Sequence, residues 1–197
     1  MNLLTIGSIL KIILTILHPI YQFKPKMLKP CIFLDRDGVI NKDRVDYVYR
    51  VEDFFIHDGV IDALKLLKAN GYLLIIITNQ SGIAKGIYQE SDVMNCYNYL
   101  QEQCGGIIDD IYYSKHHPNF TSASLMQKPD SLMLEKAMAK HGINPNQSWM
   151  IGDAERDIKA GKKAGVKTIH IHNGKEDTQL ADYQFETLLE AAQFVTK

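Results

Sequence analysis

The stretch Cys31-Ile32-Phe33-Leu34-Asp35-Arg36-Asp37-Gly38 decides the expected fold, because four apolar residues end abruptly at an acidic turn. A short apolar run of this kind, bounded by a turn, is typical of a buried strand. Similar runs follow at 72–77, 107–113, 149–151 and 168–171. Alternation of such strands with helical patterns predicts an α/β fold with a parallel sheet. The helical patterns lie at residues 60–70, 91–104, 131–141, 158–164 and 186–195.

Composition indicates a single globular domain. A chain of 197 residues is long enough for one domain with a real core, and 46% apolar with 23% charged residues is an ordinary globular balance. The net charge of −1 gives no reason to expect nucleic-acid binding. The three cysteines, Cys31, Cys96 and Cys104, form no Cys-x-x-Cys pair, which favours buried free thiols in a reducing cytoplasm. A monomer is favoured over an oligomer.

The apolar segment at residues 3–17 has two competing interpretations. It is shorter than the roughly 20 residues that a membrane-spanning helix needs, and Lys11 interrupts it. A signal peptide would begin with basic residues and end at an Ala-x-Ala-like site, and neither is present. Membrane contact is therefore not expected, although a signal or anchor is the alternative. We expect residues 1–26 to be an extension outside a folded domain that comprises residues 27–197.

Polar residues gather where the expected strands end. The first strand is followed by Asp35 and Asp37, the second by Thr78-Asn79-Gln80, and the fourth by Asp153. Open parallel sheets bind ligands at the carboxyl ends of their strands. Several carboxylates at one edge would repel each other, and a divalent cation would remove that repulsion. Since the ligands offered are all oxygens, Mg²⁺ is the expected ion.

The same residue types support one kind of chemistry. A carboxylate nucleophile, a second carboxylate for proton transfer, a hydroxyl, amides and the lysine of Lys128-Pro129 together indicate a phosphoryl-transfer site. A receiver domain uses similar parts, but its phosphate-accepting aspartate follows the third strand. This chain has Ser114-Lys115-His116-His117 there, which argues against that alternative.

Four motifs resemble those of the haloacid dehalogenase (HAD) superfamily of phosphohydrolases. They are DRDGVIN at 35–41, TNQSGIAKG at 78–86, Lys128-Pro129, and GDAERD at 152–157. Further segments, at 51–72, 111–118 and 172–176, resemble the heptose 1,7-bisphosphate phosphatases and their relatives, the histidinol-phosphate phosphatases. The likeness covers about residues 30–195. It implies a three-layer, Rossmann-like HAD fold with helices on both faces of the sheet.

The resemblance also implies residue roles. Asp35 would attack phosphorus and become an aspartyl phosphate, while Asp37 protonates the leaving oxygen and then activates water. Mg²⁺ would be bound by Asp35, by the backbone carbonyl of Asp37 and by Asp153, with Asp157 orienting waters or Lys128. The transferring phosphoryl oxygens would be held by Thr78, the Asn79 amide and Lys128.

Motif spacing leaves no room for a cap domain. Asn41 to Thr78 is 37 residues and Thr78 to Lys128 is 50, and each interval must already hold a helix and a strand. We therefore expect a capless, open site, with specificity shaped by a flap at 42–53 and a loop at 116–127. The expected substrate contacts are Asp43, Tyr47, Asn79, Gln80, Ser81, Lys85 and Gln127.

Two departures from the family pattern affect the expected ligands. Many heptose bisphosphate phosphatases hold a structural zinc after the third strand, but three of its four ligand positions are replaced here. Zinc is therefore not expected. His116 and His117 are assigned instead to the surface or to the side that faces the substrate. Gln127 stands where the family uses an arginine on the substrate, which removes a charge suited to phosphate.

The expected function is Mg²⁺-dependent hydrolysis of a sugar phosphate, most specifically the 7-phosphate of a manno-heptose 1,7-bisphosphate. A histidinol-phosphate phosphatase shares this chemistry and is one alternative. A non-enzymatic protein that binds phosphorylated ligands is another, but such a protein would have no need for the paired Asp35 and Asp37.

Overall fold

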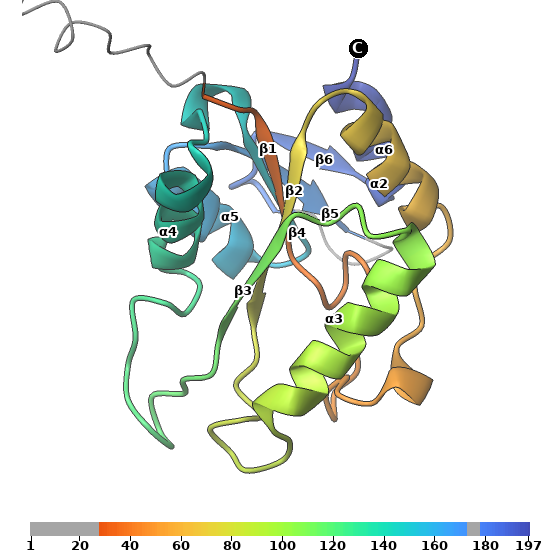
Figure 1. Cartoon of the computed structure of the whole chain (residues 1–197). Coiled ribbons are helices and arrows are strands. Elements are labelled where there is room, and N and C mark those ends of the chain that lie inside the picture. The colour runs from red at the N-terminus through yellow and green to blue at the C-terminus, as the bar shows by residue number, and fades with distance from the viewer. Residues whose placement is uncertain (1–27, 173–177) are drawn as a thin grey trace, which may run out of the picture.

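The computed structural model describes residues 28–172 and 178–197, which form a six-stranded sheet between two layers of helices (Figure 1). The expected extension at residues 1–26 lies outside the described residues, as do residues 173–176 of the glycine-bearing segment. In chain order the elements are β1 (Cys31–Leu34), a 3₁₀ helix (Val51–Asp53), α2 (Val60–Ala69), β2 (Leu73–Asn79), α3 (Glu90–Cys104), β3 (Asp110–Ser114), α4 (Leu132–His141), a second 3₁₀ helix (Pro145–Gln147), β4 (Trp149–Gly152), α5 (Glu155–Lys163), β5 (Lys167–Ile171), β6 (Tyr183–Phe185) and α6 (Leu188–Val195).

The sheet has the order β3-β2-β1-β4-β5-β6, and all its neighbouring strands are parallel. Strand β1 lies in the interior of the sheet, where Ile32 is in register with Leu74 of β2 and Trp149 of β4. Because the strands are parallel, the residues that follow β1, β2 and β4 emerge at one edge of the sheet. This edge carries the expected site.

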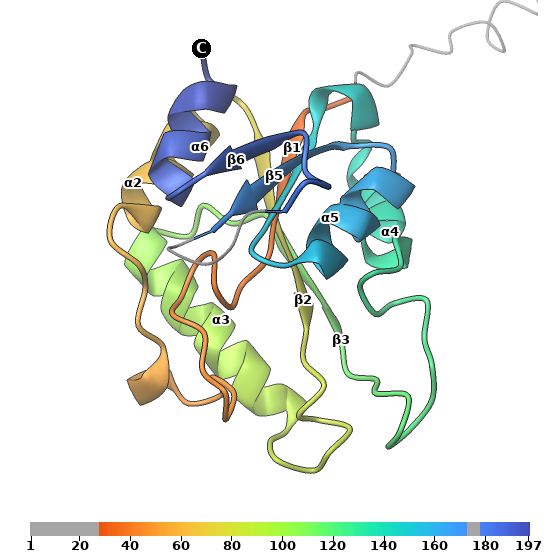
Figure 2. The ribbon, with the colours of Figure 1, turned by 180° about the vertical axis from the view of Figure 1, so that it is seen from behind.

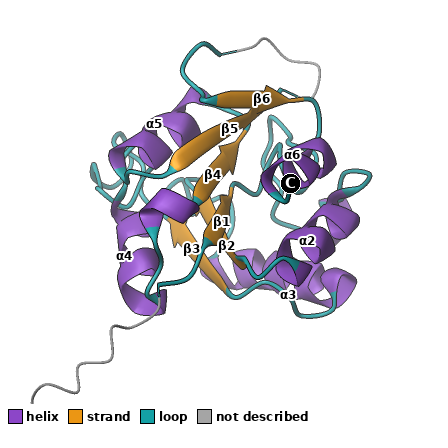
Figure 3. Cartoon of the chain, turned by 90° about the horizontal axis from the view of Figure 1, so that it is seen from above, coloured by secondary structure: helices purple, strands orange, loops and turns teal. Residues whose placement is uncertain are grey.

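Side chains of β1 alternate between two hydrophobic cores. Ile32 and Leu34 pack in the core that includes residues of α2, α3 and α6. Cys31 and Phe33 pack in the core that includes residues of α4 and α5. Figures 2 and 3 show these two groups of helices on opposite faces of the sheet. Burial on both faces explains why β1 is an unbroken apolar run.

The predicted α/β fold with a parallel sheet is confirmed, and several elements differ from expectation. Strand β3 begins at Asp110 rather than at residue 107, and α6 begins at Leu188 rather than at residue 186. Strand β6 is not predicted, because it is a three-residue edge strand without an apolar run. Helix α5 begins at Glu155 rather than at residue 158, because the Asp157 carboxylate accepts a 3.1 Å hydrogen bond from the Ala154 N–H and completes the first turn.

The loops at the carboxyl edge contain no inserted domain in the part of the chain that is described. Between β1 and β2 lie the flap, a 3₁₀ helix and α2, and between β2 and β4 lie α3, β3, α4 and their loops. The capless arrangement is therefore as expected. Among the described residues, no helix is both long and apolar enough to cross a membrane.

Candidate active site

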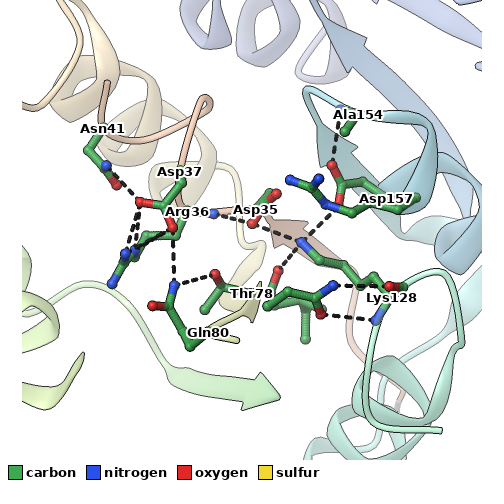
Figure 4. Close-up of polar contacts among 12 residues, drawn as sticks. Asp35, Arg36, Asp37, Asn41, Thr78, Gln80, Lys128, Ala154 and Asp157 are labelled. Carbon is green, nitrogen blue, oxygen red and sulfur yellow. Dashed lines mark hydrogen bonds and ion pairs between the residues drawn. The ribbon is translucent and has the colours of Figure 1, made fainter. Parts of the chain in front are cut away.

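A buried lysine joins two carboxylates at the carboxyl edge of the sheet. The N–H of Asp35 donates a 2.9 Å hydrogen bond to the Ile151 carbonyl, which ties the end of β1 to β4. Lys128 Nζ lies 2.8 Å from Asp35 Oδ1 and 2.7 Å from Asp157 Oδ1 (Figure 4). Asp35 and Lys128 are each 2% exposed and Asp157 is fully buried. Since buried charges are stable only when paired, the three groups fix one another's positions.

Residues at the end of β2 hold Lys128 in this position. Lys128 Nζ donates a 2.8 Å hydrogen bond to the Ile77 carbonyl. The Asn79 side chain makes two 3.0 Å hydrogen bonds with the Lys128 backbone, donating to its carbonyl and accepting from its N–H. The Asn79 side chain therefore positions the lysine, and contact between its backbone amide and a substrate stays a prediction.

Asp37 is held by three donors on the other side of Asp35 (Figure 4). The Arg36 guanidinium donates through Nε and Nη2 at 2.9–3.1 Å, Asn41 Nδ2 donates at 2.9 Å, and Gln80 Nε2 donates at 3.1 Å. Arg36 Nη2 also donates to the Val48 carbonyl at 2.6 Å, so the same residue holds the flap. The Asp37 side chain is 18% exposed and lines the pocket described below.

A cluster of carboxylates meets the requirements of a hard divalent cation. One oxygen each from Asp35, Asp153 and Asp157 lies within 4.8 Å of the others. A Cβ at Gly38, which has φ of 88°, would collide with the Asp153 carboxylate, so glycine allows this close approach. Burial and the charge of Asp157 raise the pKa of Asp35 to about 6, against the opposing effect of Lys128. An all-oxygen cluster in which carboxylates repel each other fits Mg²⁺.

The cluster agrees with the expected ligands in part. Asp35 and Asp153 come together as predicted, and Asp157 joins them while also contacting Lys128, one of the two kinds of partner expected for it. The Asp37 side chain lies outside this cluster and is directed to Arg36, Asn41 and Gln80. Its expected metal contact is through the backbone carbonyl, and that contact stays a prediction.

A pocket of about 530 Å³ opens above this edge. Seven residues expected at the site line it, namely Asp37, Asp43, Tyr47, Asn79, Ser81, Gln127 and Lys128. The flap and the loop after β3 both contribute, through Tyr47 and through His117 and Gln127. The pocket is therefore formed by the segments that were expected to shape specificity.

Two expected substrate contacts lie behind the pocket wall. Gln80 is 1% exposed. Its Nε2 donates to Asp37 and, at 2.9 Å, to the Thr78 hydroxyl, and its Oε1 accepts a 2.7 Å hydrogen bond from the Tyr88 hydroxyl. Lys85 Nζ donates a 2.6 Å hydrogen bond to the Tyr47 hydroxyl, so it reaches the pocket through Tyr47. Gln80 is placed to position Asp37 and Thr78 rather than to touch a ligand.

Sequence reasoning missed several residues of the site. Arg44 and Arg156 line the pocket, Arg36 holds Asp37, and Tyr88 holds Gln80. Arg36 and Arg156 stand inside the recognised DRDG and GDAERD motifs, and their charge beside the carboxylates expected at the site was the available signal. Tyr88 carried no such signal, because its contact depends on how the loop after β2 folds back.

Within residues 28–172 and 178–197, no second group of potential metal ligands is found, and this includes the loop after β3. His117 lies at the pocket and packs edge-on against Phe120, with 5.0 Å between ring centroids. The expected absence of zinc stays a prediction.

The sequence is similar to those of a known family and of named phosphatases. The family model described as HAD-hydrolase-like matches residues 125–192. The chain is 37% identical over 182 residues to a D-glycero-beta-D-manno-heptose-1,7-bisphosphate 7-phosphatase of Haemophilus ducreyi, covering 86% of this chain and 100% of that protein. It is 38% identical over 173 residues to a D-glycero-alpha-D-manno-heptose-1,7-bisphosphate 7-phosphatase of Campylobacter jejuni, covering 85% and 96%.

The fold is also similar to a solved structure. The crystal structure of D,D-heptose 1,7-bisphosphate phosphatase from B. bronchiseptica, complexed with magnesium and phosphate, superposes with a TM-score of 0.76. The two chains are 24% identical, and the match covers 84% of this chain and 97% of the other.

Proposed function

The chain belongs to the heptose-1,7-bisphosphate phosphatase family of HAD-like hydrolases, and on this basis we propose that it hydrolyses the 7-phosphate of a D-glycero-D-manno-heptose 1,7-bisphosphate. The observation that carries the proposal is the position of Asp35, which is buried at the tip of β1 with the Lys128 ammonium 2.8 Å from its Oδ1. A nucleophilic carboxylate beside a fixed cation is suited to attack on a phosphate monoester.

In the first step, a carboxylate oxygen of Asp35 forms a bond to phosphorus as the bond from phosphorus to the sugar oxygen breaks. Asp37 supplies the proton that the departing sugar oxygen takes up. The product of this step is an aspartyl phosphate on Asp35 and the free sugar hydroxyl. Dividing one difficult displacement into two easier ones is the advantage of the covalent route.

In the second step, water attacks phosphorus and the bond between phosphorus and Asp35 breaks. Asp37 now accepts the proton from that water, which returns both carboxyl groups to their starting states. Arg36, Asn41 and Gln80 all donate to Asp37, and these hydrogen bonds hold its carboxyl group in place for both proton transfers.

Thr78 and Lys128 neutralise and orient the transferring phosphoryl group. Charge spreads over the phosphoryl oxygens as the bond to the leaving group loosens, and prearranged donors stabilise that charge. Thr78 is 1% exposed and its hydroxyl accepts from Gln80, which leaves its own hydrogen for a phosphoryl oxygen. The Asn79 amide is proposed as a further donor.

Asp35, Asp153 and the Asp37 carbonyl would hold Mg²⁺. When bound, this ion neutralises carboxylate repulsion and phosphate charge. Asp157 would keep Lys128 in place, as its 2.7 Å contact with that lysine supports. We propose that no zinc is required.

The phosphorylated sugar would occupy the pocket between the flap and the loop after β3. Asp43, Tyr47, Ser81 and Gln127 line it and are proposed to contact the sugar, with Lys85 acting through Tyr47. The three cysteines are all free and buried, which supports a reducing compartment, and we propose that the enzyme acts in the cytoplasm as a monomer.

A phosphate-release panel tests this function. The purified protein is assayed at fixed Mg²⁺ with the α and β anomers of the heptose 1,7-bisphosphate, histidinol phosphate and fructose 1,6-bisphosphate. Both anomers are included because the relatives carry both names. We expect kcat/KM for one heptose anomer to exceed that for every non-heptose substrate by at least about tenfold, or about 1.4 kcal/mol of transition-state binding. A higher kcat/KM for histidinol phosphate would overturn the proposed substrate.

A further inference from the structure

Arg156 has unused hydrogen-bond donors at the wall of the pocket. It lies in the first turn of α5, and its side chain is 47% exposed. Its Nε is 4.0 Å from Asp157 Oδ1, which is beyond hydrogen-bond distance, and that oxygen already lies 2.7 Å from Lys128 Nζ. The described residues accept no hydrogen bond from its guanidinium, whose N–H groups form a planar fork.

The other cations at or beside this pocket are already engaged. Arg44 donates to both carboxylate oxygens of Asp46 and to Asp53, each at 2.9 Å. Lys128 is paired with two carboxylates, and Lys85 donates to the Tyr47 hydroxyl. Among the described residues that line the pocket, Arg156 is thus the guanidinium left to bind an anion.

The location of Arg156 is also unfavourable for the helix alone. The N-terminal turn of a helix carries positive partial charge, so a cation in that turn is disfavoured. Partial burial lowers the pKa of Arg156, but the charges of nearby carboxylates, Asp157 foremost, outweigh this effect and raise the pKa. Its guanidinium donates no hydrogen bond to those of them that the structure describes. It does add positive charge where an incoming phosphate would meet the pocket wall.

Depth in the pocket distinguishes Arg156 from the groups around the reacting phosphoryl. Thr78 is 1% exposed and Lys128 is 2% exposed, so both lie at the buried floor. Arg156 is far more exposed and lies on the wall. A substrate whose reacting phosphate contacts the floor would bring its second anionic group toward this wall.

Building on the proposed function, we infer that Arg156 binds the phosphate of the bisphosphate substrate that is not hydrolysed. A guanidinium fork can donate two parallel hydrogen bonds to a phosphate, which gives orientation as well as charge. Arg156 is therefore a specificity residue that favours sugars with two phosphates over those with one.

Steady-state kinetics with paired substrates tests this role. Arg156→Gln, Arg156→Lys and Lys159→Gln are compared with the wild type on the heptose 1,7-bisphosphate and on the heptose 7-phosphate, which lacks the second phosphate. Lys159→Gln is the matched control, because Lys159 lies on the same helix, is 51% exposed and pairs with Glu155 away from the pocket lining.

We expect Arg156→Gln to raise KM for the bisphosphate about tenfold or more, with kcat changed less than about twofold. Its kcat/KM for the 7-phosphate should stay within about twofold of the wild type, as should both reactions of Lys159→Gln. Arg156→Lys should recover part of the lost bisphosphate affinity, because it restores the charge without the fork.

Two results would overturn the inference alone. One is an equal loss on both substrates in Arg156→Gln, which would assign the arginine to the reacting phosphoryl or to the fold. The other is an unchanged KM for the bisphosphate. A wild-type protein that hydrolyses neither heptose phosphate would instead overturn the proposed function and this inference with it.

Discussion

The Tyr88 hydroxyl donates a 2.7 Å hydrogen bond to Gln80 Oε1 beneath the pocket, and this contact fixes which way the Gln80 amide faces. With the oxygen used by Tyr88, Nε2 must face Asp37 Oδ2 and Thr78 Oγ1, at 3.1 and 2.9 Å. One buried tyrosine therefore positions two residues of the proposed reaction without touching either.

Tyr88→Phe should lower kcat about fivefold with KM nearly unchanged. Losing one buried hydrogen bond of about 1 kcal/mol frees the Gln80 amide to turn its oxygen toward Asp37, which disfavours the working geometry. Tyr72→Phe is a matched control, because the Tyr72 hydroxyl contacts the Val195 carbonyl outside the pocket. The positioning role is refuted if both variants retain the wild-type kcat.

Asp35→Asn should abolish turnover while the fold is retained. The amide keeps the shape of the carboxyl group but is a poor nucleophile, so phosphate release should fall by at least about a thousandfold. Phosphate release and circular dichroism measure the two properties, with the exposed helix variant Asp62→Asn as control. Appreciable residual activity in Asp35→Asn would remove the assignment of the nucleophile.

Mg²⁺ should stabilise the wild-type protein through Asp153. At a concentration of about 100 times Kd, binding to the folded state adds about 2.7 kcal/mol, which raises Tm by roughly 5–10 °C in a chain of this size. The rise should be reversed by EDTA and should be much smaller in Asp153→Asn, as measured by thermal unfolding. An equal rise in that variant would place the ion elsewhere.

Asp110 should stabilise the fold in a pH-dependent way without affecting activity. It lies at the start of β3, opposite the site edge, and its Oδ2 is 2.8 Å from Lys140 Nζ and 2.7 Å from His141 Nε2. Partial burial raises the pKa of Asp110, but hydrogen bonds from Lys140 and His141 outweigh this and hold the pKa below its usual value. A lowered folded-state pKa gives stability that is present above the unfolded-state pKa and lost as pH falls through the folded-state pKa.

Asp110→Asn should therefore lower the free energy of unfolding by about 1 kcal/mol at pH 7. The difference from the wild type should shrink as the pH falls below about 4, where Asp110 begins to protonate in the unfolded chain. Urea unfolding at several pH values measures it. A difference that is independent of pH would show that the carboxylate charge is not the cause.

A shortened chain that begins at Met27 should fold and keep its activity. Lys29 makes backbone hydrogen bonds with Gly142 and Asn144, at 2.9 Å each. The shortened chain keeps Lys29 and therefore keeps these contacts. Soluble yield, Tm and kcat/KM should match those of the full chain. An insoluble or inactive product would assign residues 1–26 to the folded domain.

The grouping of Asp35, Lys128, Asp153 and Asp157 follows from their place after the strands or beside the loops of one sheet edge. Parallel strands send their carboxyl ends to the same side, so motif position along the chain translates into proximity. The same reasoning could not foresee which way Gln80 points. Its N–H donates a 2.7 Å hydrogen bond to the Ser114 carbonyl, and this tertiary contact turns its side chain inward.

Short or exposed elements were also beyond prediction. Strand β6 has three partly exposed residues, and its pairing with Ile169–Ile171 of β5 makes it a strand. Arg156 stands inside a recognised motif, but its residue type also fits a solvated helix face, and only the structure places it at the pocket. The periodicity of apolar residues predicts the elements that bury a face in the core. It carries little information about edge strands or about residues at the mouth of a pocket.

The alternating packing of β1 has a consequence for how such an enzyme diversifies. A slip of one residue along this strand would send Ile32 and Leu34 into the opposite core and turn Asp35 away from Lys128, so the position of the Asp35 carboxylate is tied to the packing of both cores. The flap and the loop after β3 line the pocket above this edge instead. Substitutions in those loops would change which sugar the pocket binds and would leave the contact between Asp35 and Lys128 in place.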